Sequence, residues 1–164
     1  MRSLCAHLVG LAVLVAPPVC AQSVTIVSGD TISQDGTTYR LWGIEAPDPH
    51  QTCMKGWPAG EEAVRVLEEL IADRPVSCEP RDKDRSGRTR AICQADGTDL
   101  GAAMVRSGFA WAQLGQSKGY VLEETRAAGE RKGVHAHRCQ TAANWRVKNP
   151  RPFEQQEGGP RDRN

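Results

Sequence analysis

Residues 28–48 read SGDTISQDGTTYRLWGIEAPD. Positions 31–33 and 38–42 are rich in β-branched and aromatic side chains, which favour extended strands. Between them, residues 34–36 read Gln-Asp-Gly, a sequence typical of a tight turn. We therefore expect two β-strands joined by a short turn, with the chain leaving the second strand through a Gly and a Pro.

This stretch also contains four ionisable residues of interest: Asp30, Arg40, Glu45 and Asp48. In a flat strand Arg40 and Glu45, five positions apart, would point to opposite faces. Gly43 lies between them and permits a bend that could direct both into one pocket. Carboxylates beside arginines suit a metal ion and a phosphate. The sequence DRSGR at 84–88 supplies the other half of this predicted site.

The rest of the chain alternates strand-like and helix-like segments. A helix over 59–72 is predicted because its apolar residues recur at helical spacing and define one buried face. Asp99 has the right chemistry to cap a short helix through Arg106, which Gly108 would close. We further expect strands at 24–27, 76–78 and 89–94 and a last helix over 117–132, with Tyr120, Ala127 and Ala128 on its inner side.

Four motifs in this order resemble the staphylococcal nuclease family of calcium-dependent phosphodiesterases. They are GDT at 29–31, YRLWGIEAPD at 39–48, DRSGR at 84–88 and DLGAAMVRSGFAWA at 99–112. The resemblance covers residues 24–133, and the spacing of the motifs makes it specific. It implies an α+β fold with a five-stranded OB-like β-barrel and about three helices. It also implies endonucleolytic cleavage of DNA and RNA that leaves the phosphate on the 3′ side. We expect the protein to be a monomer.

The resemblance assigns the metal and the base. Asp30 and Glu45 would be carboxylate ligands of Ca²⁺, the backbone carbonyl of Ala46 a further ligand, and Asp48 the general base. Three of these positions depart from the family pattern, which has aspartate for Glu45, threonine for Ala46 and glutamate for Asp48. Since a shift of about 1 Å at a catalytic group can cost on the order of a hundredfold in rate, these changes bear on activity.

The resemblance also assigns the substrate contacts. Arg40 and Arg88 match the two arginines that grip phosphate oxygens, where a planar guanidinium can form two parallel hydrogen bonds. Tyr120 matches a position that lies against a nucleotide base. Taken singly, each residue also has an ordinary structural role, such as a turn aspartate or a hairpin-tip arginine, and their joint order favours the site.

The N-terminus predicts export. Residues 1–21 carry an early Arg, a short apolar run and small residues before a cleavage point after Ala21, as in a secretory signal peptide. An uncleaved anchor and a lipoprotein with Cys20 at its start are the alternatives; the apolar run is short for a membrane span. The predicted mature chain is exported to the periplasm or the medium and has no contact with a membrane.

Four cysteines remain after residue 21, an even number that argues for two disulfides in an exported domain. Cys78 and Cys93 lie in the two strand-like runs that flank the basic turn, so we expect them to pair, which leaves Cys53 with Cys139. Free buried thiols are the alternative.

Charge and composition set the remaining expectations. The chain has 21 Lys and Arg and 20 Asp and Glu, so it lacks the broad basic surface of a tight duplex binder. We expect a nuclease-like domain over 22–139 and a polar tail over 140–164 that is disordered from 149. The rival to a nuclease is a non-catalytic OB-type module that binds an oligonucleotide or a protein partner.

Overall fold

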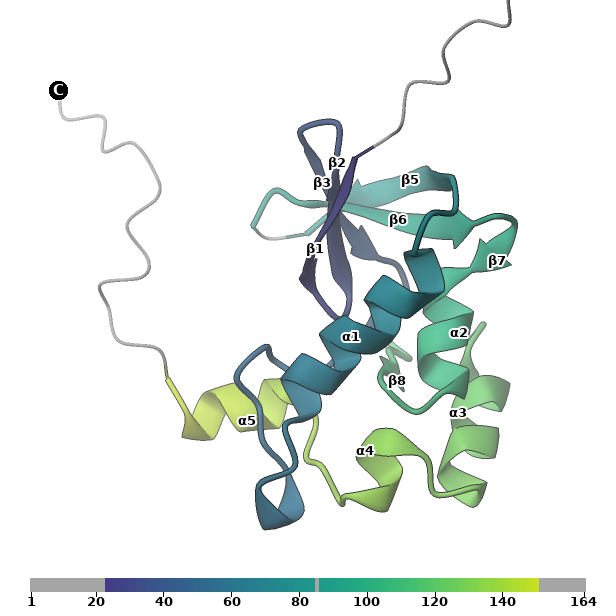
Figure 1. Cartoon of the computed structure of the whole chain (residues 1–164). Helices are drawn as coiled ribbons and strands as arrows, with labels where there is room; N and C mark the ends of the chain where they lie inside the picture. The colour runs from purple at the N-terminus through teal and green to yellow at the C-terminus, as the bar shows by residue number, and fades with distance from the viewer. Residues whose placement is uncertain (1–22, 85, 151–164) are drawn as a thin grey trace, which may run out of the picture.

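The computed structural model describes residues 23–84 and 86–150. The predicted signal peptide at 1–21 lies outside these residues, as does most of the predicted disordered tail. The described chain forms a twisted sheet with helices packed beneath it (Figure 1). This arrangement confirms the predicted α+β class.

The first sheet half is a meander of β1 (Val24–Ser28), β2 (Thr31–Gln34) and β3 (Thr37–Leu41), paired antiparallel. The turn between β2 and β3 has Asp35 at φ 50° and Gly36 at φ 77°. A two-residue turn with both residues at positive φ matches the twist of the flanking strands. The hairpin predicted from residues 31–42 is therefore confirmed.

The second half consists of β5 (Val76–Lys83), β6 (Thr89–Ala95) and the short β7 (Thr98–Asp99). β3 and β6 pair in parallel, with Arg40 opposite Arg90, and this pairing joins the two halves. The resulting order is β1-β2-β3-β6-β5, with β7 beside β6. Among the described strands β1 and β5 are the two ends of this order, so the sheet is OB-like but its pairing does not close into the expected barrel.

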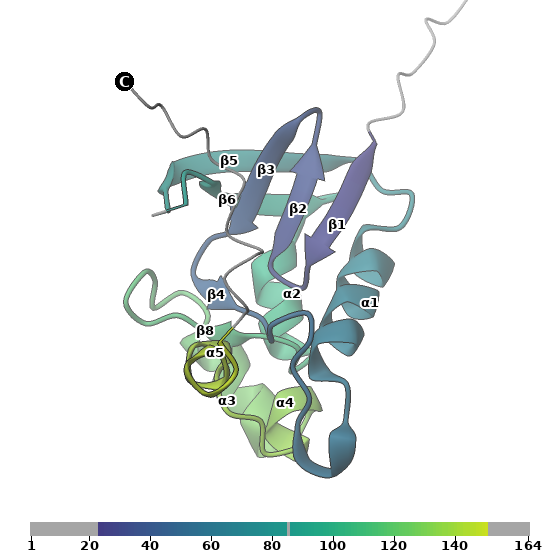
Figure 2. The same cartoon turned by 90° about the vertical axis from the view of Figure 1, so that its left-hand side faces the viewer.

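A separate two-stranded ladder continues from β3. Gly43, at φ 75°, turns the chain sharply, and β4 (Ile44–Glu45) then pairs with β8 (Trp111–Ala112) instead of extending β3. A side chain at position 43 would approach Ser117 and Tyr120 to about 3 Å or less, so both space and backbone conformation favour glycine there. Figure 2 shows this ladder below the main sheet.

The described chain has five α-helices, two more than expected, and one turn of 3₁₀-helix: α1 (Ala59–Ile71), α2 (Leu100–Arg106), α3 (Val121–Gly129), α4 (Gly133–Ala136), α5 (Ala142–Lys148) and η1 (Met54–Gly56). The first two match the predicted helices, and the Asp99 side chain caps α2 by accepting a hydrogen bond from Ala102 N. The predicted helix over 117–132 is shorter than expected, and its Ala128 is exposed.

The core lies between the sheet and the helices α1 and α2. Its fully buried members include Ile32, Leu41, Leu67 and Met104. Two disulfides, Cys53–Cys139 and Cys78–Cys93, form the pairs that the sequence favours. Of the helices within the described residues, none combines the length and the apolar composition that a membrane span requires.

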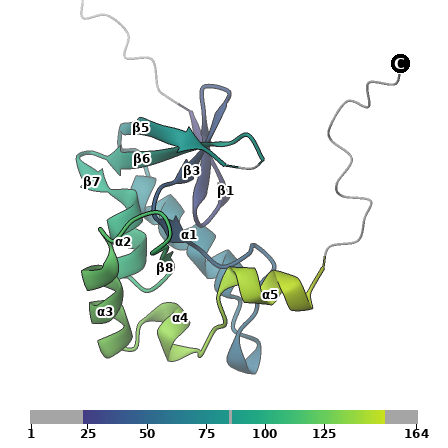
Figure 3. The same cartoon turned by 180° about the vertical axis from the view of Figure 1, so that it is seen from behind.

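Helix α5 projects from the C-terminal side of the fold, away from α2 and α3 (Figure 3). It lies near the start of α1 in Figure 1 and below β4 in Figure 2, and Arg146 of α5 is hydrogen-bonded to Glu45 of β4. It occupies residues predicted to form a polar tail, and it contributes a side chain to the candidate site.

Candidate active site

Asp30 is the best-connected residue of the site. It follows β1, is only 7% exposed, and accepts hydrogen bonds on both carboxylate oxygens. Ser28 Oγ and Thr31 Oγ1 donate to Oδ1 at 3.0 and 2.9 Å, while Arg40 Nη2 and the backbone N–H of Ala46 donate to Oδ2, both at 3.2 Å. Four donors match the usual acceptor capacity of a carboxylate. Asp30 therefore holds the side chain of Arg40 and the backbone of Ala46 in place.

The guanidinium group of Arg40 has one nitrogen that is hydrogen-bonded, Nη2, and one that has no hydrogen-bond partner, Nε. Its side chain is 18% exposed, and Nη2 forms the ion pair with Asp30. Its Nε is one of two buried side-chain nitrogens in the described chain that have no hydrogen-bond partner. An unpaired buried donor is costly, so an acceptor supplied by a ligand would be stabilised there.

Glu45 follows the bend at Gly43 and its side chain is 8% exposed. Its Oε1 accepts a hydrogen bond from Nη2 of Arg146, at 2.8 Å. Arg146 lies in α5, 101 residues further along the chain. Arg40 and Glu45 are therefore not paired with each other, because the bend at Gly43 directs them to different partners.

Asp48 lies in a buried, tightly packed loop and is 3% exposed. Its side chain accepts a hydrogen bond from the backbone N–H of His50 at 3.3 Å, and its own N–H donates to Oε1 of Gln51 at 3.2 Å. Gln51 is itself 1% exposed and donates through Nε2 to the carbonyl of Gln140 at 2.8 Å. The loop carrying Asp48 is thus fixed by the C-terminal segment.

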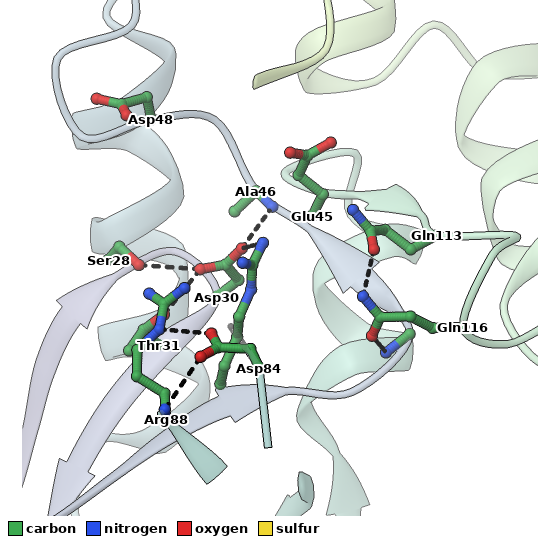
Figure 4. A network of polar contacts seen from close by, with 12 residues as sticks. Ser28, Asp30, Thr31, Glu45, Ala46, Asp48, Asp84, Arg88, Gln113 and Gln116 are labelled. Carbon is green, nitrogen blue, oxygen red and sulfur yellow. Dashed lines mark hydrogen bonds and ion pairs between the residues drawn. The ribbon is translucent and has the colours of Figure 1, made fainter. Parts of the chain in front are cut away.

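Arg88 is held by Asp84 across the basic hairpin. Its Nε donates to Asp84 Oδ2 at 2.7 Å, and Asp84 Oδ1 accepts from the backbone N–H groups of Ser86 and Arg88. Burial alone would raise the pKa of the Asp84 carboxyl, but the hydrogen bonds from Arg88 outweigh it and hold that pKa below its usual value. Figure 4 shows the Arg88 side chain extending toward Thr31 and Asp30.

The predicted site residues fall into linked groups. Asp30, Arg40 and Ala46 are in direct contact, and Figure 4 shows the carboxylates of Glu45 and Asp48 pointing away from that of Asp30. In the part of the chain that the structure describes, no group of three or more His, Cys, Asp or Glu is arranged to hold a metal ion.

Tyr120 is packed inside the fold. It is 8% exposed within the core, and its hydroxyl donates to Asp99 at 2.9 Å. Burial, followed by the nearby Asp99 carboxylate, raises the pKa of Tyr120 above its usual value. The ring packs close to Gly43 and Gly101, and its contact with a nucleotide base stays a prediction.

Sequence reasoning missed Arg146 and the buried Gln51. Neither has a local signal, since each acts through a partner far along the chain. Thr141 was the one available hint of α5, because a threonine before a run of helix-forming residues is a typical N-cap, and here it accepts a hydrogen bond from Asn144 N.

Comparison with known proteins supports the motif analysis. The family model described as "Staphylococcal nuclease homologue" matches residues 38–136, more than half of the chain. The chain belongs to the staphylococcal nuclease family. Membership in this family indicates a nuclease with a nucleic-acid substrate, and calcium dependence is general in the family.

Two relatives of this chain carry informative names. One is the succinoglycan biosynthesis protein ExoI of Rhizobium meliloti, 30% identical over 139 residues, which are 80% of this chain and 72% of the relative. Another is an uncharacterized endonuclease of Haemophilus influenzae, 26% identical over 116 residues, which are 68% of this chain and 62% of the relative. The matched residues of the family model end before α5 begins.

The chain has oxygen donors of the kind that this family would use to bind calcium. Asp30 and Glu45 supply nearly buried carboxylate oxygens, and oxygen is the ligand that Ca²⁺ prefers. Both carboxylates nevertheless already have partners: Asp30 accepts four hydrogen bonds, and Oε1 of Glu45 accepts one from Arg146. A cation at Glu45 therefore has to share or replace the Arg146 contact.

Proposed function

We propose that this member of the family is an exported nuclease that hydrolyses phosphodiester bonds of DNA and RNA with the assistance of Ca²⁺. The observation that carries the proposal is the Arg40 guanidinium, which is fixed by Asp30 and yet has a buried Nε without an acceptor. A phosphate oxygen is an acceptor that a guanidinium group binds strongly.

Phosphodiester hydrolysis needs an attacking water, relief of charge on the phosphate, and a stabilised leaving oxygen. Arg40 and Arg88 carry the second requirement, because guanidinium hydrogen bonds strengthen as charge builds on the phosphate oxygens in the transition state. Both are already oriented by carboxylates, Arg40 by Asp30 and Arg88 by Asp84. This orientation reduces the reorganisation needed when the phosphate binds.

The proton-accepting residue in this scheme is Asp48, positioned by its buried loop. Glu45, Asp30 and the Ala46 carbonyl would hold Ca²⁺, which when bound screens the phosphate charge and lowers the pKa of a coordinated water. Replacement of Asp48 by Asn should slow turnover tenfold or more if its carboxylate accepts the proton. Unchanged turnover would assign the base to another group.

Export is supported by the two disulfides, which persist in oxidising compartments and are rare in the cytosol. The name of the Rhizobium relative concerns succinoglycan biosynthesis and that of the Haemophilus relative an endonuclease. We follow the second, because the positive charge of the two arginines suits a phosphodiester.

The direct test is cleavage of single-stranded and duplex DNA and of RNA by the mature protein, with Ca²⁺ or with a chelator. We expect cleavage that the chelator abolishes and that Arg88→Ala reduces by at least tenfold. Arg65→Ala is the matched control, because Arg65 is also an ion-paired arginine but lies on the exposed face of α1. Equal activity of the two variants would contradict the role of Arg88.

One observation favours the rival, a non-catalytic OB-type module that binds an oligonucleotide or a protein partner. Asp30 and Glu45, the two proposed cation ligands, are both paired with arginines, and the described residues hold no ready metal cluster. The same assay separates the two proposals, because the rival predicts oligonucleotide binding without cleavage in any metal.

A further inference from the structure

Helix α5 carries a third arginine to the candidate site. Arg146 lies outside residues 38–136, which the family model matches, and yet its Nη2 is 2.8 Å from Glu45 Oε1. The side chain of Glu45 is 8% exposed, whereas that of Arg146 is 43% exposed. A half-exposed arginine therefore covers a nearly buried carboxylate that the family motif contributes.

The placement of α5 is not a loose surface contact. The disulfide Cys53–Cys139 joins the loop that follows Asp48 to the residue three positions before α5 begins with Ala142. Gln51 adds a buried hydrogen bond to the same segment through the Gln140 carbonyl. Two further contacts act alongside, namely Met54 N to the His137 carbonyl at 3.3 Å and Trp57 stacked on His137 at 4.1 Å between ring centroids.

We propose that Arg146 sets the cation affinity of Glu45 by competing with the metal for its carboxylate. This inference rests on the proposed function, in which Glu45 is a cation ligand. The guanidinium neutralises Glu45 when the cation is absent, and α5, anchored by its disulfide, returns it to the carboxylate whenever the cation leaves. Arg146 thereby determines how much Ca²⁺ is needed to load the site.

The direction of the effect follows from electrostatics. A positive charge in hydrogen-bond contact with Glu45 repels a divalent cation at the same carboxylate, and the repulsion is weakly screened because Glu45 is nearly buried. Removing the guanidinium leaves an uncompensated carboxylate, which a cation then binds more tightly. Since Arg146 itself is half exposed, we expect about a three- to tenfold change in affinity.

The test is Ca²⁺ binding by isothermal titration calorimetry to residues 22–164, comparing the wild type with Arg146→Gln. The variant should bind Ca²⁺ about three- to tenfold more tightly. Lys148→Gln is the matched control, because it removes the same charge from the same helix, and Lys148 is exposed. Its dissociation constant should equal that of the wild type.

Arg146→Lys tests whether charge is the cause, and it protects the test against a folding defect in the first variant. It keeps the positive charge near Glu45 and should tighten binding much less than Arg146→Gln. Equal dissociation constants for the wild type and Arg146→Gln would overturn the proposal, as would the absence of Ca²⁺ binding or equal tightening by Arg146→Lys and Arg146→Gln. If the predicted shift is found but no form cleaves nucleic acid, the nuclease proposal fails and the role of Arg146 stands.

Discussion

Replacing Gly60 by alanine should displace the proposed general base without touching its side chain. Gly60 is the second residue of α1, where the helix packs directly on the loop that contains Asp48. A Cβ at this position would lie 2.1 Å from the carbonyl oxygen of Asp48 and 2.4 Å from that of Pro49. Carbon contacts under 3.0 Å are essentially never observed, so helix and loop would have to separate by about 1 Å.

Two effects of different size should follow. Overpacking of this kind costs on the order of 1–3 kcal/mol in the free energy of unfolding. A displacement of about 1 Å at a catalytic carboxylate costs about a hundredfold in kcat/KM, chiefly through kcat. The assay is cleavage of a labelled oligonucleotide together with urea unfolding.

Gly129→Ala is the matched control for this prediction. Gly129 also lies in a helix, α3, but a Cβ there meets nothing within 4 Å. The control should gain about 0.5–1 kcal/mol of stability, since alanine favours a helix over glycine, and should keep full activity. If Gly60→Ala and Gly129→Ala behave alike, the close approach of α1 to Asp48 is not what positions the base.

Three other predictions test the surroundings of the site. Tyr120→Phe should lower the free energy of unfolding by about 0.5–1.5 kcal/mol, because it removes the hydrogen bond to Asp99, while leaving KM unchanged; a raised KM would show that the hydroxyl takes part in substrate binding. Replacing Cys53 and Cys139 together by Ser opens a loop with a sequence separation of 86 and should cost up to about 4.6 kcal/mol in urea unfolding; a negligible loss would contradict the anchoring of α5. Because the pKa of Asp84 is lowered, its hydrogen bonds stabilise the fold above its ordinary pKa of 3.8, and this stabilisation is lost as the pH falls through the lowered pKa. An NMR titration midpoint of Asp84 above 3.8 would contradict this.

Local patterns predicted the hairpin and the first two helices well. The turn at Asp35-Gly36 needs two positive φ angles, and an Asp-Gly pair is a sequence that favours them. Helix α1 has one apolar stripe at the helical period, and Asp99 caps α2 as its side-chain chemistry predicts. These features depend on neighbours within a few positions, which is the range over which a single sequence is informative.

The pairing within the site could not be predicted in the same way. The sequence suggested that Gly43 would direct Arg40 and Glu45 into one pocket, and the bend is present, but it sends Glu45 into the β4–β8 ladder and toward α5. Helix α5 has only seven residues, too few for a stable isolated helix, so it depends on contacts with distant parts of the chain. A contact between positions 45 and 146 leaves no periodic signature.

The disulfide between Cys53 and Cys139 reaches three residues past the last position matched by the family model, 136. A protein shortened at that boundary would retain Cys53 and lose its partner. In an oxidising environment the orphan thiol can join two molecules covalently. Such a fragment would form disulfide-linked dimers that result from the truncation and that a reducing agent separates. It would need Cys53→Ser before its oligomeric state could be compared with that of the longer chain.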